Sequence, residues 1–329
     1  MTMAIRILRW SGRLVAALLL ALVLLLLALR LLAWSREDES GKPASTRMVT
    51  TPFGAVAATV SGPADGPPIM LVHGTAAWSG FWRDVSAHLA ARGWRVIAID
   101  LPPFGYSDHD PLARYDRTTQ ALRLAAVLSA EAAHPAVVVG HSFGAGAATE
   151  LALRAPGRVK RLVLVDAALG ALDPPDDARS PAERILGQQL IAQPLTSAVL
   201  TNPSMTPRLL RSMIARKSEA DRWIDVLRQP MRRRGTTGAY AQWLPALFTR
   251  NDGSLSRRSA NLAAITVPVA LIWGQADTVT PLAQGENIAR LTHAKSFIRL
   301  SGVGHIPHIE DPPGFLRALD TSIAADGGK

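Results

Sequence analysis

The pattern in this chain best suited to chemistry is a serine between two glycines. Residues 137–146 read VVVGHSFGAG, so a run of branched apolar residues stops at Gly140 and a small-residue helical pattern follows Gly144. A strand, a G-x-S-x-G turn and a helix in this order predict a tight turn that exposes the hydroxyl of Ser142. The helix would aim its free N–H groups at the same point, where they can stabilise an oxyanion. The pattern therefore predicts a nucleophilic serine.

A serine hydroxyl becomes a nucleophile when a histidine takes its proton and an acid fixes the tautomer of that histidine. His305 lies in the glycine-flanked segment GVGHIP, and His308 is its competitor. Asp277 follows the apolar run VALIW and is the expected acid. Asp166, which also ends an apolar run, is the rival, but we expect it to cap the loop or helix that follows. The order Ser142, Asp277, His305 matches a known triad order.

An oxyanion needs two backbone N–H groups close to the serine. Phe143 follows the nucleophile and is expected to supply one of them, and Thr75 in the segment HGTAAW is expected to supply the other. Trp78, Phe104 and His141 are predicted to contact the substrate, because they lie on segments near the expected pocket.

Most of the chain alternates between continuous apolar runs and helical patterns, which predicts a mostly parallel sheet covered by helices on both faces. Residues 174–261 break the alternation with arginine-rich helical segments, and we expect them to form a cap over the strand ends. The expected strands are 68–73, 95–100, 136–140, 159–166, 267–273 and 296–300, with a hairpin pair in 51–60. The expected helices are 78–91, 115–130, 145–155, 182–192, 207–217, 221–229, 240–249 and 312–323.

Five motifs in this order resemble the α/β-hydrolase fold superfamily, in its cap-bearing serine hydrolase branch. They are LVHG (71–74), DLPPFGYSD (100–108), GHSFGAG (140–146), the Asp277 loop and GVGHIPHIEDP (302–312). The resemblance spans about residues 51–324 and implies an α/β fold with a helical cap. In similar sequences the first histidine of GHIPH is the catalytic one, which favours His305. Pro103 departs from the pattern, because similar sequences usually have glycine there, and it puts the shape of a loop near the site in doubt.

The N-terminus carries an apolar segment. Residues 14–29 have no charge, and the run reaches Trp34 if Arg30 is tolerated. About 20 apolar residues span a bilayer core, so we expect a membrane anchor over 1–34 that crosses the membrane through residues 14–34. A linker over 35–46 and a hydrolase domain over 47–329 follow. A cleaved signal peptide is the alternative, although its apolar region is usually shorter and residues 31–35 form a poor cleavage site.

Composition narrows the range of partners. The formal net charge is +10, but the arginines are spread and no nucleic-acid motif accompanies them, so an anionic lipid surface is favoured over nucleic acid. The chain has no cysteine, which excludes disulfides, a thiolate nucleophile and cysteine-bound metals. The histidines lack metal-ligand spacing, and no dinucleotide-binding glycine motif follows a strand. We therefore expect a small-molecule substrate and no cofactor.

These features predict a membrane-anchored serine hydrolase that cleaves an apolar ester through an acyl-enzyme. The same residues would also serve a C–C bond hydrolase, an amidase or an acyltransferase. A non-catalytic binding protein on the same fold is an alternative of a different class.

Charge around the apolar segment predicts its orientation. Arg6, Arg9 and Arg13 precede it and the acidic residues 37–39 follow it, so the N-terminus should be cytoplasmic and the hydrolase domain extracytoplasmic. Protease added to cells stripped of any outer membrane should then digest the hydrolase domain. Protection until lysis would contradict this orientation, and a mature N-terminus near residue 35 would show a cleaved signal instead of an anchor.

Overall fold

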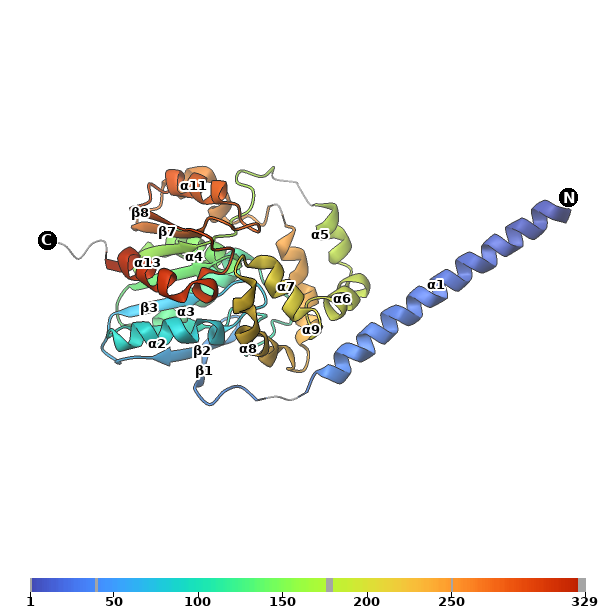
Figure 1. Cartoon of the computed structure of the whole chain (residues 1–329), viewed down its shortest axis with the longest axis horizontal. Helices are drawn as coiled ribbons and strands as arrows, with labels where there is room; N and C mark the ends of the chain where they lie inside the picture. The colour runs from blue at the N-terminus through green and yellow to red at the C-terminus, as the bar shows by residue number, and fades with distance from the viewer. Residues whose placement is uncertain (1, 39–40, 176–179, 250, 325–329) are drawn as a thin grey trace.

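An eight-stranded sheet forms the centre of the molecule. The computed structural model describes residues 2–38, 41–175, 180–249 and 251–324 (Figure 1). The strand order is β1-β2-β4-β3-β5-β6-β7-β8; β2 runs antiparallel to β1 and β4, and the other neighbouring pairs are parallel. The strands are β1 (Thr46–Thr51), β2 (Gly54–Ser61), β3 (Pro68–Val72), β4 (Arg95–Ile99), β5 (Ala136–His141), β6 (Val159–Val165), β7 (Val269–Gly274) and β8 (Ser296–Leu300).

Helices cover both faces of the sheet, as the continuous apolar strands predict. Successive side chains of one strand point to opposite faces, so Leu271 packs into one buried cluster and Ile272 into the other. One cluster is covered by α3 (Arg117–Glu131), α4 (Phe143–Arg154) and α11 (Leu282–Leu291). The other is covered by α2 (Arg83–Ala91) and α13 (Pro312–Ala324). The arrangement is the predicted mostly parallel sheet covered by helices on both faces.

Between β6 and β7 the chain leaves the sheet and forms a set of helices, which we call the inserted helices. They are α5 (Pro181–Leu186), α6 (Gln189–Ala198), α7 (Thr206–Met213), α8 (Asp221–Met231) and α9 (Thr236–Trp243), with the 3₁₀ turns η3 (Lys217–Ala220) and η4 (Leu244–Leu247). Trp223 of α8 and Leu210 of α7 pack with Phe81 and Ile309, which follow β3 and β8. The inserted helices therefore rest on the loops at one end of the sheet (Figure 1).

The remaining short elements connect the larger ones. They are α10 (Ser259–Ala263), α12 (Pro307–Glu310), η1 (Ser79–Trp82), η2 (Pro156–Arg158) and η5 (Leu255–Arg257).

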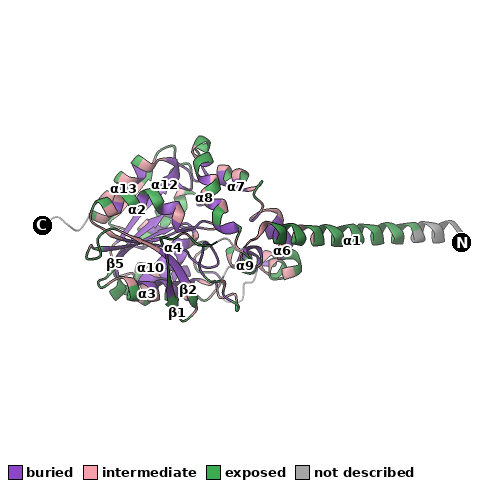
Figure 2. Cartoon of the chain, turned by 90° about the horizontal axis from the view of Figure 1, so that it is seen from below, coloured by how far each residue is buried: buried purple, intermediate pink, exposed green. Residues whose placement is uncertain are grey.

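The N-terminal helix α1 (Thr2–Arg36) projects away from the rest of the molecule (Figures 1 and 2). Its segment Trp10–Arg36 contains an 18-residue window with a mean hydropathy of 2.9, and it is long and apolar enough to cross a membrane. This candidate span is longer at both ends than the predicted 14–34. Almost all of its side chains are exposed, as expected of a helix that meets lipid instead of a protein core.

The structure corrects one boundary drawn from the sequence, and it shows contacts at the start of the predicted linker. The hairpin pair is wider than 51–60, because Pro52 and Phe53 form its turn and β1 begins at Thr46. The start of the predicted linker makes specific contacts: the Glu37 carboxylate accepts the N–H groups of Gly235 (2.8 Å) and Thr237 (2.7 Å) at the beginning of α9. A carboxylate at a helix N-terminus satisfies free N–H groups and complements the helix dipole, so Glu37 fastens the end of α1 to the inserted helices.

Candidate active site

Ser142 occupies a sharp turn between β5 and α4. Its backbone has φ 50° and ψ −121°, a region that L-residues rarely adopt. Two glycines permit the turn: a Cβ at Gly140 would lie 2.7 Å from the Cα of Ala145, and one at Gly144 would lie 2.3 Å from the His73 carbonyl oxygen. Close packing of α4 against β5 and the end of β3 therefore holds the serine in this strained conformation.

A chain of hydrogen bonds leads from Ser142 to the acid. The Nε2 atom of His305 lies 2.8 Å from the Ser142 Oγ, and its Nδ1 lies 2.8 Å from the Asp277 Oδ2. All three side chains are buried. An ionised carboxylate only accepts hydrogen bonds, so Asp277 places the proton of neutral His305 on Nδ1 and leaves Nε2 free to accept the serine proton.

Asp277 is surrounded by donors. Its Oδ1 accepts the N–H groups of Val279 and Thr280, and its Oδ2 accepts the hydroxyl of Thr280 as well as the His305 proton. Burial by itself would raise the pKa of Asp277, but the hydrogen bonds from His305 and Thr280 outweigh it and lower that pKa below its usual value. Asp277 is therefore ionised at neutral pH.

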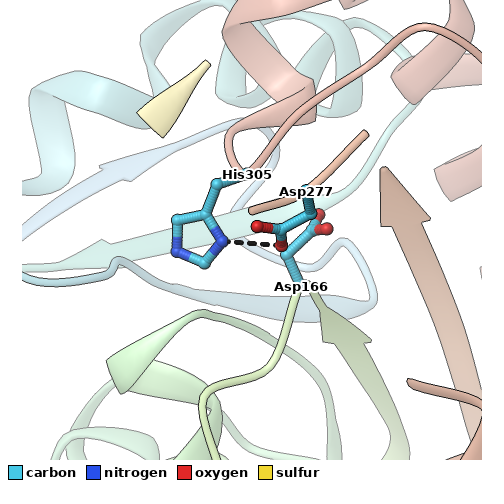
Figure 3. Close-up of side chains that lie close together, drawn as sticks. All are labelled: Asp166, Asp277 and His305. Atoms are coloured by element: carbon cyan, nitrogen blue, oxygen red, sulfur yellow. Dashed lines mark hydrogen bonds and ion pairs between the residues drawn. The ribbon is translucent and has the colours of Figure 1, made fainter. Parts of the chain in front are cut away.

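The prediction that Asp166 caps a following helix or loop is wrong. Asp166 is fully buried, accepts the N–H of Gly274 (2.8 Å) and lies beside Asp277, on the same side of the His305 ring (Figure 3). Burial and the Asp277 charge raise the pKa of Asp166 well above its usual value. Two adjacent buried carboxylates cannot both ionise easily, so Asp166 carries the proton of the pair.

The ligand atoms of Asp166, Asp277 and His305 lie within 4.8 Å of one another, a geometry that acidic metal sites share. In this cluster the two facing atoms of His305 and Asp277 already share a hydrogen bond, and backbone and hydroxyl donors occupy both Asp277 oxygens. This set of donors fits a proton relay better than a cation.

Three other histidines are buried near the site as neutral groups. His141 lines a cavity beside Ser142 and donates from Nε2 to the His305 carbonyl oxygen (2.8 Å). His73 accepts the Leu101 N–H at Nε2 (2.8 Å). His308, the competitor for the base, stacks on Trp82 with a ring separation of 4.2 Å, away from the serine hydroxyl. Burial lowers the pKa of His141 to about 3 and that of His73 to about 4, and it depresses the pKa of His308 strongly.

Glu310 is a residue of the site that the sequence reasoning missed. Its buried carboxylate accepts the N–H groups of Gly304 and Ile306, on either side of His305. It also accepts the N–H groups of Ala215 and Arg216, just after α7. Glu310 thus fixes the His305 loop and joins it to the inserted helices. Its place in GHIPHIEDP was the available signal, but a glutamate beside a helix start reads as an ordinary capping residue.

Phe143 and Thr75 both lie beside Ser142. Phe143 is the first residue of α4, so its N–H has no acceptor within the helix. Thr75 lines both cavities that reach Ser142. The preceding Gly74 passes so close that a Cβ there would be 3.0 Å from the Ser142 Cβ. Both residues therefore border Ser142.

Two cavities meet at Ser142 and Thr75. The larger, about 540 Å³, is lined by polar residues such as Arg117, Asp252 and Arg257. The apolar residues Leu247 and Phe248 also line it. The smaller, about 150 Å³, is almost wholly apolar. Its apolar walls come mainly from the inserted helices and the loops after β3 and β8: Ala76, Ala77, Phe81, Leu200, Leu209, Leu210, Met213, Leu227, Met231 and Ile306.

Two of the predicted substrate contacts lie elsewhere. Trp78 packs edge-on against Tyr106 and donates its indole N–H to the Val226 carbonyl (2.6 Å), outside both cavities. Phe104 is fully buried behind Phe143, among aromatic side chains of the core. Both aromatic side chains support the walls of the site, because their surfaces are already used in packing.

Comparison with known proteins agrees with this geometry. The family model for the alpha/beta hydrolase fold matches residues 67–312. The chain is 31% identical to 2-hydroxymuconate semialdehyde hydrolase of Pseudomonas sp. (strain CF600), over 79% of this chain and 87% of that protein. It resembles the crystal structure of a membrane phospholipase A (TM-score 0.65, 23% identity, 99% of both chains). It also resembles an esterase from Thermogutta terrifontis (TM-score 0.68, 22% identity, 85% of this chain and 98% of that one).

The buried histidines predict an acid-sensitive fold. His308 stays neutral when folded but takes a proton in the unfolded chain below about pH 6.5. The free energy of unfolding is therefore unaffected by protonation of this histidine at pH 7. It decreases as the pH falls below about 6.5, because only the unfolded chain gains the proton. The melting temperature of His308→Met should rise relative to the wild type as the pH is lowered from 7 to 5. His134→Met, at an exposed position, is the control. A constant difference across this range would contradict the assignment.

Proposed function

The chain belongs to the alpha/beta hydrolase fold family, and we propose that it is a membrane-anchored serine hydrolase that cleaves a carboxylic ester. One observation carries this proposal. The Ser142 hydroxyl, the His305 imidazole and the Asp277 carboxylate form a continuous hydrogen-bonded relay that opens into two cavities. A binding protein would gain nothing from a strained serine coupled to a base and a buried acid.

In the proposed mechanism His305 takes the proton of Ser142 as the hydroxyl oxygen attacks the ester carbonyl carbon. Asp277 stabilises the imidazolium that forms, and Asp166, protonated and neutral, leaves the acid pair with a single negative charge. The carbonyl oxygen becomes an oxyanion facing the N–H groups of Phe143 and Thr75, each of which is worth about 3 kcal/mol in the transition state.

Breakdown of this intermediate releases the alcohol. The imidazolium of His305 gives its Nε2 proton to the leaving oxygen as the carbon–oxygen bond breaks, and an acyl-Ser142 ester remains. Water then enters, gives a proton to His305 and attacks the acyl carbon. The acid leaves when His305 returns that proton to the Ser142 oxygen, which restores the starting state.

Cavity chemistry supports an ester with an apolar part. The smaller cavity is lined by leucine, methionine and phenylalanine and would hold hydrocarbon. The larger cavity has cationic side chains, but they are already engaged: Arg257 pairs with Asp252 (3.2 Å) and Arg117 donates to the carbonyls of Ala168 and Leu169. A neutral polar group suits that side better than a second carboxylate.

We further propose that α1 anchors the enzyme with its N-terminus in the cytoplasm and the hydrolase domain outside, and that the inserted helices form the cap. The length and hydropathy of Trp10–Arg36 support the anchor, and the arginines before it support the orientation.

Cleavage of a C–C bond is a second candidate. It is favoured by the 31% identity to a 2-hydroxymuconate semialdehyde hydrolase over most of both chains. The same serine, histidine and aspartate would be used, but the substrate would carry an additional carboxylate.

The two acids predict different mutational effects. Asp277→Asn should lower kcat by roughly 10⁴, because His305 loses the acceptor that fixes its tautomer. Asp166→Asn should keep kcat within several-fold, because an amide replaces a neutral acid of the same shape. Ser142→Ala should remove on the order of 10⁶ in kcat. The assay is p-nitrophenyl ester hydrolysis by full-length protein at equal folded concentration. The reverse ranking of the two acids would reject the proposed relay.

Comparing kcat/KM for the two kinds of substrate distinguishes ester hydrolysis from C–C bond hydrolysis. We expect full-length protein to hydrolyse p-nitrophenyl esters with a preference for an acyl chain that fills the apolar cavity, and to leave a 2-hydroxy-6-oxo dienoate unchanged. A kcat/KM for the dienoate above that for every ester would make C–C hydrolysis the function.

A further inference from the structure

The inserted helices carry an apolar surface that has no partner among the residues that the structure describes. It consists of Ile185 on α5, Leu190, Ile191 and Leu195 on α6, and Leu247 and Phe248 at the end of η4. We call these six residues the apolar rim. Leu190 is 75% exposed and Ile185 53% exposed. Because α5 contacts both α6 and η4, the elements that carry these six residues are neighbours.

Helix α6 has apolar residues on both sides. Its inner side buries Ala192, Pro194 and Thr196, while Leu190 and Leu195 face outward. An apolar outer side of a helix is normally covered by protein or lipid. Its neighbour α8 has the ordinary pattern, with the charged residues Asp221, Arg222 and Asp225 outside. The outward leucines thus distinguish α6 from α8.

The position of α6 relative to α1 identifies its environment. The Ser197 hydroxyl of α6 donates to the Leu29 carbonyl (2.6 Å), and Arg36 donates to the Ser197 carbonyl. The span of 27 residues, Trp10–Arg36, is about 40 Å long, which exceeds a hydrocarbon core of about 30 Å by roughly seven residues. With Trp10 at one interface, Leu29–Arg36 lies at the opposite headgroup level, where Trp34 and Arg30 are favoured.

We propose that the apolar rim rests in the lipid interface beside α1 and admits the ester substrate from the bilayer. The occupant is a lipid surface, because α6 is docked on the part of α1 that leaves the hydrocarbon core (Figures 1 and 2). Exposed Arg30 on α1 suits anionic headgroups.

The rim also leads to the nucleophile. Leu247 and Phe248 line the larger cavity, whose wall includes Ser142 and Thr75. A lipid ester that passes these two residues from the interface would therefore enter the cavity that contains Ser142. This inference deepens the proposed function, since it assigns a membrane-borne ester to the same site.

Labelling tests the contact without reference to activity. The chain has no cysteine, so Leu190→Cys in the full-length protein can carry a single environment-sensitive fluorophore. Leu122→Cys on α3, 43% exposed, is the matched control. In vesicles of phosphatidylethanolamine and phosphatidylglycerol, the Leu190 label should shift to the blue and be quenched by nitroxide lipids. The control label should show neither effect.

Two outcomes would overturn the contact. A Leu190 label that stays water-like in vesicles would mean that the rim does not touch lipid. A blue shift without lipid quenching, growing with protein density, would mean that a second copy of the chain covers the rim.

Enzyme activity tests whether the substrate enters from the bilayer. The double substitution Leu190→Gln and Leu195→Gln should lower hydrolysis of an ester held in vesicles about tenfold and leave hydrolysis of a short soluble ester unchanged. Leu122→Gln should change neither rate. Equal rates of the double variant and wild type on vesicles would reject lateral entry. If the wild type hydrolyses no ester at all, the proposed function fails while the labelling result still decides the membrane contact.

Discussion

The backbone of Ser142 is the constraint on which the site depends. A φ of 50° at a serine costs free energy, and it persists because α4, β5 and the end of β3 are packed too closely to relax. Gly140 and Gly144 make this packing possible, since side chains there would collide with neighbouring backbone. The strain is therefore supported by the sheet, and it places the hydroxyl where His305 can reach it.

The base is held as firmly as the nucleophile, but by different means. The Glu310 carboxylate accepts N–H groups from both sides of His305 and from the segment after α7. In addition, His141 donates to the His305 carbonyl. The N–H of His305 itself donates to the Met213 carbonyl at the end of α7 (3.0 Å). The inserted helices thus shape the cavities and also position the base, which couples the site to the surface that we assign to the membrane.

The sequence predicted the fold because its signals are local: continuous apolar runs define parallel strands, and glycines around Ser142 define the turn. Parallel strands also end at one edge, so Asp277 and His305 could be expected near the serine. The other features depend on tertiary packing. Asp166 became a protonated partner because β6 and β7 are neighbours. Trp78 packs edge-on against Tyr106. Glu310 accepts a backbone N–H from Ala215, which is far from it in the chain. The spacing of residues carries no signal for any of these three contacts.

The proposed function requires that Ser142 is a nucleophile activated by His305. The most direct measurement is mass spectrometry of the full-length protein after treatment with a fluorophosphonate, which phosphonylates activated serines. We predict a single adduct on the peptide that contains Ser142, absent in Ser142→Ala and strongly slowed in His305→Gln. Failure of the folded protein to form an adduct, or an adduct on another serine that survives in Ser142→Ala, would contradict the account.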